Sequence, residues 1–283
     1  MVGVIAMSGL GIDPVDLVDP FAPAVPADSR VWEAAVKMGR VRRPCAVIFI
    51  RDPSGDMGLY LTARKVAEEV FELSEEGIVL VERGRISWGL DRRVVEISLK
   101  ISMVLDTSGI SGIVDGVYNS DCVEIVRGDQ TPLGVVTEDS LIRVLLRAIP
   151  EDMRAEDIAS KPIEIIDLDA PLIEAIGVMI QRGFRRLVIT SQDRVAGVIT
   201  MLDIIHRVSE SHIRGDPEEI LLRGSIGGIG YEGPLFIPEN TGVRALAKKL
   251  LGTRSKCVLV GSPENPLGIV TEKDLIRIIR ENI

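Results

Sequence analysis

Aromatic residues are scarce in this chain of 283 residues, because Phe, Trp and Tyr together make up only 4% of it. The core must therefore be filled by Val, Ile and Leu, which favours β-branched strands packed on aliphatic helices. No apolar run approaches the ~20 residues that a membrane span needs. The apolar residues 1–10 also lack the basic leader of a signal peptide. A cytoplasmic location is therefore expected.

Positive charge is also in short supply. The chain has 33 Lys and Arg against 42 Asp and Glu, which gives a net charge of −9. An acidic chain without a long basic run is a poor partner for nucleic acid or for an anionic membrane, so neither is expected. One dense basic stretch exists, formed by Lys37, Arg40, Arg42 and Arg43. It is predicted to be a solvated helix end, where cations complement the helix dipole.

Residue patterns typical of catalysis are missing as well. The two histidines, His206 and His212, lie six residues apart, so they do not share a helix face as zinc ligands would. The three cysteines, Cys45, Cys122 and Cys257, have no zinc-ligand spacing. No Ser–His–Asp or Cys–His motif is visible. The sequence therefore indicates a protein without catalytic activity, catalytic cofactor or metal.

What the chain does contain is one short phrase repeated four times. A strand with a glycine and two or three apolar residues ends at Thr, in residues 58–62, 134–137, 197–200 and 268–271. An apolar-periodic segment follows each phrase and predicts a helix. Another apolar strand precedes each phrase across a turn rich in Gly, Pro, Asp and Ser, which is typical of a hairpin.

A further helix is predicted upstream of each hairpin. The clearest begins near Asp169 and Pro171, with Asp169 suited to the N-cap. Each unit is therefore predicted as strand, helix, strand, strand, helix. A unit of ~60 residues buries too little surface to be stable alone, so the units should pack together. Residues 77–90 do not fit the repeat, and either an extra hairpin or the lead-in strand of the second unit is predicted there.

This pattern resembles the CBS domain, whose closing strand and helix carry Gly-h-h-Thr/Ser-x-x-Asp, where h is apolar. A chain of four such units is similar to the γ subunit of AMP-activated protein kinase and to archaeal four-repeat proteins. The resemblance implies an α+β fold of four βαββα repeats in two Bateman modules, packed as a disc within one chain or as a homodimer. The modules would be residues 1–150, with repeats 1 and 2, and residues 151–283, with repeats 3 and 4.

The resemblance also implies a regulatory adenine nucleotide, AMP, ADP or ATP, bound by the C-terminal module. Only repeats 3 and 4 match the motif in full, since Lys65 and Ser140 stand where the first two repeats would have Asp. The N-terminal module is therefore expected to be degenerate. The implied ligand-binding residues are Asp203 and Asp274 for the ribose, with Thr200 and Thr271; Arg185, Arg186 and Lys256 for phosphate; and, for the purine, Pro162 and Ile163 in the third unit and Gly233 and Pro234 in the fourth.

Three alternatives stay open at this point. Thr-x-x-Asp is also a capping box, in which Thr and Asp satisfy the first turn of a helix without any ligand. The protein could then be an interaction scaffold with unoccupied clefts that regulates a protein partner. A sensor of S-adenosylmethionine or another adenosyl ligand is the third alternative.

Overall fold

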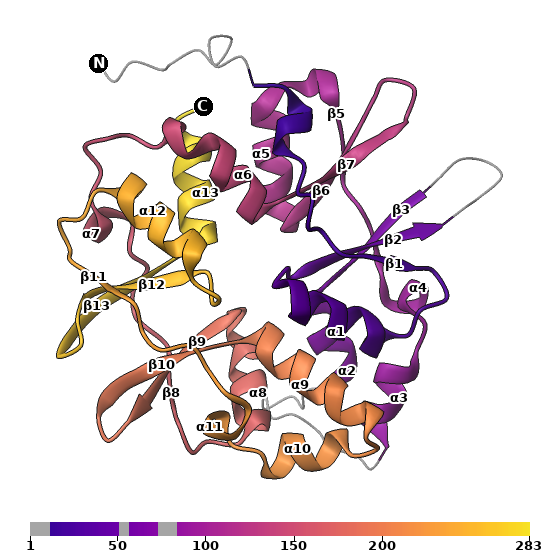
Figure 1. Cartoon of the computed structure of the whole chain (residues 1–283), viewed down its shortest axis with the longest axis vertical. Coiled ribbons are helices and arrows are strands. Elements are labelled where there is room, and N and C mark those ends of the chain that lie inside the picture. The colour runs from indigo at the N-terminus through magenta and orange to yellow at the C-terminus, as the bar shows by residue number, and fades with distance from the viewer. Residues whose placement is uncertain (1–11, 51–56, 73–83) are drawn as a thin grey trace. The chain divides into compact units, whose positions relative to one another are not determined.

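The computed structural model describes residues 12–50, 57–72 and 84–283 (Figure 1). Within them the order strand, helix, strand, strand, helix recurs four times, as predicted. Each of the four phrases is a strand that ends at its Thr and runs directly into a helix. The α+β fold of four βαββα repeats is therefore confirmed.

The chain divides into two compact units. Unit 1 comprises Met1–Pro20, Ile101–Ile163 and Leu235–Ile283, and unit 2 comprises Phe21–Lys100 and Glu164–Pro234. Unit 2 therefore holds repeats 1 and 3, and unit 1 holds repeats 2 and 4. Each unit takes one repeat from each half of the sequence. The predicted modules of residues 1–150 and 151–283 stay a prediction.

In unit 2, α1 (Val31–Val41) of repeat 1 packs against α9 (Met201–Ile213) of repeat 3, and α2 (Ala63–Val70) packs against α8 (Leu172–Arg182) and α9 (Figure 1). Short helices α3 (Arg85–Asp91), α4 (Val94–Ile97), α10 (Pro217–Arg223) and α11 (Ile226–Ile229) follow the repeats. The repeats consist of β1 (Ala24–Pro26), α1 (Val31–Val41), β2 (Cys45–Ile50), β3 (Met57–Thr62) and α2 (Ala63–Val70), and of β8 (Ile165–Asp167), α8 (Leu172–Arg182), β9 (Arg186–Ser191), β10 (Arg194–Thr200) and α9 (Met201–Ile213).

In unit 1, α13 (Glu272–Glu281) of repeat 4 packs against α5 (Gly109–Ser120) and α6 (Glu138–Leu145) of repeat 2. The 3-10 helices among the described residues of this unit are η2 (Pro14–Leu17), η3 (Asp106–Ser108) and η4 (Leu146–Ala148). Helix α7 (Ala155–Ile158) precedes repeat 3. The repeats consist of β5 (Met103–Leu105), α5 (Gly109–Ser120), β6 (Cys122–Val126), β7 (Pro132–Thr137) and α6 (Glu138–Leu145), and of β11 (Phe236–Ile237), α12 (Val243–Gly252), β12 (Cys257–Ser262), β13 (Asn265–Thr271) and α13 (Glu272–Glu281).

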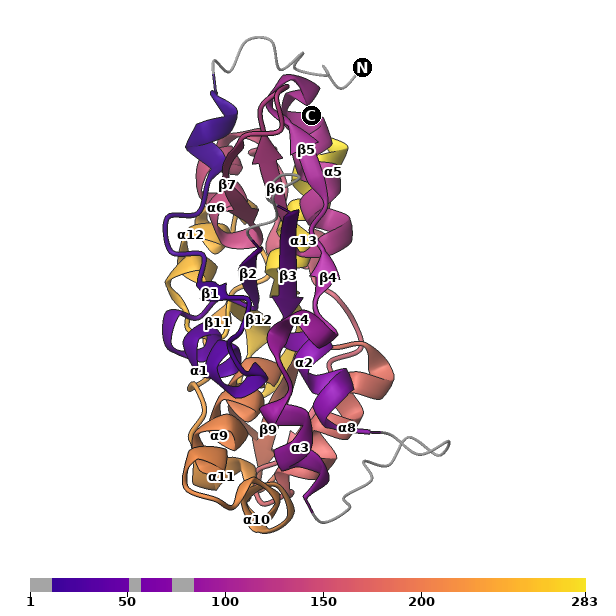
Figure 2. The ribbon, with the colours of Figure 1, turned by 90° about the vertical axis from the view of Figure 1, so that its right-hand side faces the viewer.

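Every repeat forms its own small sheet with one topology. The first strand pairs parallel with the second, which pairs antiparallel with the third. In repeat 1 a fourth strand, β4 (Leu99–Lys100), adds to β3, so that β3 lies between β2 and β4 (Figure 2). Each unit has its own core of Val, Ile, Leu and Ala, which is consistent with the low aromatic content.

The segment that precedes each repeat crosses the closing strand of a different repeat. We call these the crossing segments: residues 18–19 on β7, 99–100 on β3, 159–160 on β13 and 231–232 on β10. The contact always falls two residues before the Thr. Ser160 N donates to Ile269 O at 2.8 Å, and Asp19 N donates to Val135 O at 2.8 Å. Repeats 1 and 2 thus exchange their crossing segments, and so do repeats 3 and 4.

The crossing segments explain the glycine of the repeated phrase. A Cβ on Gly197 would lie 2.4 Å from Glu232 O, and one on Gly268 would lie 2.8 Å from Ala159 Cβ. A Cβ on Gly134 would lie 2.5 Å from a methyl group of Val18. Only glycine leaves room for the second backbone to pass.

Gly197→Ala should therefore destabilise unit 2. The new methyl group meets a backbone carbonyl that cannot rotate away, so we expect a loss of ~1–3 kcal/mol in the free energy of unfolding, as for other overpacked sites. Chemical denaturation measures it. Gly252→Ala, where no atom lies within 4 Å of the added Cβ, is the control and should not destabilise. Equal stability of the two variants would contradict the close approach.

One local prediction is wrong, and another is tested only in part. Helix α8 begins at Leu172 with Pro171 as its N-cap, two residues after the predicted Asp169. The backbone N–H of Asp169 instead donates to Asp167 Oδ1 at 2.8 Å, so the acids shape the turn before the helix. In the stretch 77–90, residues 77–83 lie outside the described residues, and the rest contributes to helix α3 rather than to a hairpin or strand.

None of the helices in the described residues combines the length and the apolar character that crossing a membrane requires.

Candidate functional site

In repeat 3 the predicted capping box is present at the start of α9. Asp203 Oδ2 accepts hydrogen bonds from Thr200 N at 3.0 Å and from Thr200 Oγ1 at 2.6 Å. Asp203 N donates back to Thr200 Oγ1 at 3.1 Å. The carboxylate is 7% exposed. Capping thus engages one carboxylate oxygen and leaves the other for a different partner.

One such partner is Arg42, at the end of α1 in repeat 1. Its Nη1 lies 2.6 Å from Asp203 Oδ1, and the arginine side chain is 24% exposed. The prediction that the basic stretch is a solvated helix end is therefore wrong for Arg42. Sequence reasoning missed this contact because the two residues are 161 positions apart and belong to different repeats.

Repeat 4 has the same box with a different second partner. Asp274 Oδ2 accepts from Thr271 N at 2.8 Å and from Thr271 Oγ1 at 2.9 Å. Asp274 Oδ1 accepts from Ser160 Oγ at 2.8 Å. The nearest cation among the described residues is Arg277, whose Nη2 lies 3.9 Å from Asp274 Oδ1. Asp274 is therefore a buried carboxylate held by hydroxyl and amide donors rather than by a close ion pair.

The crossing segments regroup the predicted purine-binding residues. Pro162 and Ile163 follow Ser160, which lies on the closing strand of repeat 4 beside Asp274. Gly233 and Pro234 follow Glu232, which pairs with Val198 on the closing strand of repeat 3. Each purine candidate pair therefore follows a residue that contacts the closing strand of the other repeat, and the purine-binding role of these residues stays a prediction.

The predicted phosphate-binding residues lie near the same helix starts. Arg185 O accepts from Met201 N at 2.9 Å, and Arg186 pairs with Thr200 in the hairpin, so both flank the repeat 3 box. Lys256 is engaged elsewhere. Its Nζ lies 2.9 Å from Asp139 Oδ1 of repeat 2 and donates to Leu251 O at 2.6 Å. With 13% of its side chain exposed, Lys256 is a structural cation in this arrangement.

Repeat 2 holds its carboxylate in an unexpected place. Thr137 Oγ1 donates to Asp19 Oδ2 at 2.6 Å, and Asp19 is 4% exposed. Asp19 occupies the crossing position that Ser160 has in repeat 4, while Ser140 occupies the helix position of Asp274. Acid and hydroxyl are thus exchanged between these two repeats. In repeat 1, Thr62 caps Lys65 N at 3.0 Å without an acid three residues later.

His206 lies close to the repeat 3 box. Its ring packs on Gly39 of α1, where an added Cβ would lie 2.3 Å away. Burial lowers the pKa of His206 below its usual value; Glu210 opposes this, Arg42 and Arg40 add to it, and Asp203 opposes it. The neutral imidazole is therefore the form that fits beside α1.

The stability of the protein should consequently fall with His206 protonation. Because the pKa is lowered in the folded state, the unfolded chain binds the proton first. The stabilisation is fully present above the unfolded pKa of about 6.5 and is lost progressively as the pH falls from there through the lowered pKa of the folded state. One proton gives at most about 1.4 kcal/mol per pH unit. Chemical denaturation between pH 8 and pH 5 gives the free energy of unfolding as a function of pH. This free energy should fall less steeply with decreasing pH for His206→Gln than for the control His212→Gln. Equal slopes would refute the lowered pKa of His206 in the folded protein.

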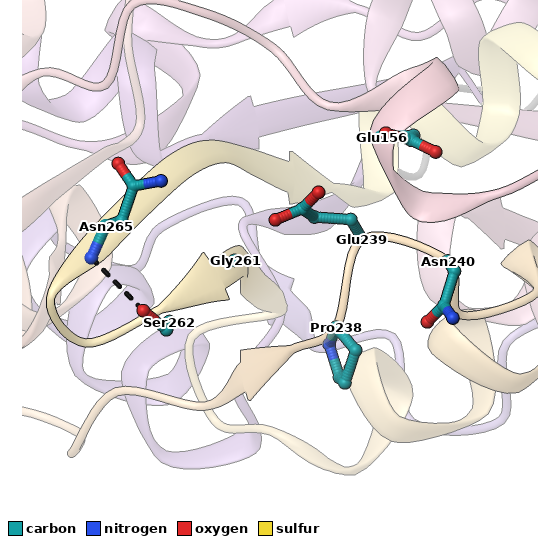
Figure 3. Close-up of a pocket in the computed structure, with 7 residues that line it drawn as sticks. All are labelled: Glu156, Pro238, Glu239, Asn240, Gly261, Ser262 and Asn265. Atoms are coloured by element: carbon teal, nitrogen blue, oxygen red, sulfur yellow. Dashed lines mark hydrogen bonds between the residues drawn. The ribbon is translucent and has the colours of Figure 1, made fainter.

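A separate open cleft lies at the far end of the repeat 4 hairpin (Figure 3). It has a volume of about 500 Å³ and none of the predicted site residues lines it; its walls are Glu156, Pro238, Glu239, Asn240, Gly261, Ser262 and Asn265. Figure 3 shows the bond from Asn265 N to Ser262 Oγ, 3.2 Å long, that closes the hairpin beside it. In the described part of the chain, no group of three or more His, Cys, Asp or Glu side chains is arranged to hold a metal ion.

Comparison with known proteins agrees with this geometry. The CBS domain family matches residues 155–210 and 229–281. A 33.4 kDa protein from the ribosomal RNA operon of Thermofilum pendens is 26% identical over 93% of this chain and 89% of its own length. Protein MK0525 of Methanopyrus kandleri is 29% identical over 39% of this chain, and the match spans only 53% of that relative.

Solved structures extend the likeness to all four repeats. Protein MJ1225 of Methanocaldococcus jannaschii, described as a proposed archaeal homologue of the γ subunit of AMP-activated protein kinase, superposes with a TM-score of 0.77. The superposition covers 94% of this chain and 99% of MJ1225 at 18% sequence identity. The fold is therefore shared along nearly the whole chain, and the CBS domain family matches the sequence of the third and fourth repeats directly.

Proposed function

We propose that the protein is a regulatory sensor that binds an adenine nucleotide, AMP, ADP or ATP, beside the closing helices of repeats 3 and 4, and that it has no catalytic activity. The match of repeats 3 and 4 to the CBS domain family supports a regulatory role. The N-terminal repeats would then be mainly structural. The cytoplasmic location and a regulated protein partner belong to the same proposal.

The observation that carries the proposal is the carboxylate of Asp274. It is only 10% exposed, and its nearest cation among the described residues lies 3.9 Å away. A buried carboxylate without a close counter-ion is costly unless hydrogen-bond donors surround it. Its Oδ1 is bonded by the hydroxyl of Ser160, which can rotate and accept instead. A ribose diol would supply two further hydroxyl donors to this acid.

A scaffold without a ligand is the second candidate. It is favoured by the engagement of Asp203 with Arg42 and of Lys256 with Asp139, since both implied ligand-binding residues already have partners. The difference between the two functions is therefore whether a nucleotide binds at all.

Thermal unfolding of the full chain with AMP, ADP, ATP, NAD or S-adenosylmethionine tests the proposal. A ligand present at one hundred times its Kd stabilises the folded state by about 2.7 kcal/mol, which raises the melting temperature measurably. At least one adenine nucleotide should do so. If only S-adenosylmethionine does, the ligand class changes; if no compound does, the scaffold function replaces the proposed one.

A further inference from the structure

We infer that Arg42 of repeat 1 competes with the ligand for Asp203, so that nucleotide binding in repeat 3 requires the end of α1 to release this carboxylate. The inference rests on the proposed function and concerns the regulation of that site. It makes repeat 3 a site that is closed by its own chain, whereas in repeat 4 no cation of the described residues comes closer to Asp274 than 3.9 Å.

The hydrogen-bond capacity of Asp203 is the first argument. A carboxylate accepts about four hydrogen bonds. Thr200 N and Oγ1 take two of these positions at Oδ2, and Arg42 takes one at Oδ1. At most one position is left, but a ribose diol donates two bonds. The diol can therefore bind fully only when the guanidinium moves away.

Comparison of the four repeats is the second argument. In repeats 1, 2 and 4, the residue two positions after the Thr contacts the other repeat of the same unit. The contact falls at the end of that repeat's first helix or just after it. Arg64 donates to Gly183 O, Asp139 pairs with Lys256, and Lys273 donates to Tyr118 O. Repeat 3 has the apolar Leu202 at this position, and Asp203 makes the contact instead. Among the described residues, the acid implied for the ribose thus makes the contact between repeats only in repeat 3.

The backbone of Arg42 is the third argument. Arg42 is the C-cap of α1 in the left-handed conformation, with φ 57° and ψ 43°. The equivalent C-cap of α8 in repeat 3 is Gly183, with φ 72° and ψ 19°. Glycine is favoured at such a position because it has no Cβ. An arginine held there against its backbone preference indicates that its side chain has a task.

Arg42→Gly tests the inference, because it removes the guanidinium and suits the left-handed backbone. We would measure the binding of adenosine by calorimetry in the full chain with Asp274→Ala, so that repeat 4 is silent. Adenosine carries the diol but no phosphate, so the loss of a cation cannot weaken it through phosphate. We expect Arg42→Gly to tighten binding roughly 10- to 150-fold, the range for releasing one charged hydrogen bond. Arg42→Asn, which also tolerates this conformation, should behave alike.

The matched control is Arg277→Ala in an Asp203→Ala background, since this guanidinium lies 3.9 Å from Asp274 Oδ1 and should change adenosine affinity less than about threefold. If folded Arg42→Gly and Arg42→Asn bind adenosine no tighter than the Asp274→Ala parent, the competition is refuted, even where nucleotides bind. If neither adenosine nor any adenine nucleotide binds the unmodified chain or the Arg42 variants, the proposed function fails and the inference falls with it.

Discussion

Asp274→Ala should weaken nucleotide binding at repeat 4 by roughly 10- to 150-fold, which corresponds to the loss of hydrogen bonds to a charged group. The carboxylate is buried at the start of α13 and is bonded by Thr271 and Ser160. Its loss would remove the acceptor that we propose for the ribose diol. Asp203→Ala should have a smaller effect, because a ligand there must first displace Arg42. Calorimetry on the full-length variants measures both.

Capping alone predicts a different outcome for the same variant. Loss of a cap costs about 1 kcal/mol of stability and leaves the affinity of the folded protein unchanged. Asp274→Asn distinguishes capping from ribose binding, since it keeps the size and some hydrogen bonding of the side chain but removes its charge. Alanine variants that melt a few degrees lower and bind nucleotide as the parent does would show that both acids are only caps.

Asp139→Ala should be the most destabilising substitution considered, with a loss of ~3–5 kcal/mol in the free energy of unfolding. Asp139 is 2% exposed and lies 2.9 Å from Lys256 Nζ, and its other oxygen lies 2.6 Å from Arg143 Nε. Removing the acid leaves the ammonium of Lys256 buried without its counter-ion. Equilibrium unfolding in urea gives the difference.

Lys256→Met should cost less than Asp139→Ala, because Arg143 still neutralises the acid and the methionine fills the space. The exposed pair Arg223–Glu219, with 81% and 55% of the side chains exposed, provides the surface control. Glu219→Ala should cost less than about 1 kcal/mol, as exposed pairs do. A similar loss of unfolding free energy for Asp139→Ala and Glu219→Ala would mean that the ion pair between Asp139 and Lys256 contributes little to stability.

The sequence predicts the repeated elements because local patterns determine them. The strand before each Thr, the helix after it and the hairpin upstream all follow from periodicity and turn residues within a few positions. Asp169 shows the limit of local rules, since an acid near a helix start also bonds in the preceding turn. Residues 84–90 show a similar limit. Their apolar residues Ile86 and Leu90 suit a strand as well as a helix, and the structure buries them on one face of helix α3.

The surroundings of the site could not be predicted in the same way, because they depend on contacts between distant parts of the chain. Arg42 reaches Asp203 from another repeat, and Ser160 reaches Asp274 on a crossing segment. In repeat 2 the acid, Asp19, is on the crossing segment and the hydroxyl, Ser140, is on the helix, whereas repeat 4 has the reverse arrangement. A comparison of the four phrases alone therefore does not find the carboxylate of Asp19. A search for polar residues at the crossing positions would have found Asp19 and Ser160, once it was known that these segments exchange.

The crossing segments restrict how a gene for such a protein can be divided or built up. A break between the first and second repeats would separate residues 18–19 from β7 and residues 99–100 from β3. A break near residue 150 would sever none of the four crossing contacts, although each core draws residues from both halves. Two polypeptides made from such a split gene would keep their strand pairing and would have to reassociate through their helices. Duplication and fusion of repeat doublets, rather than of single repeats, is therefore the route that keeps every strand paired at each step.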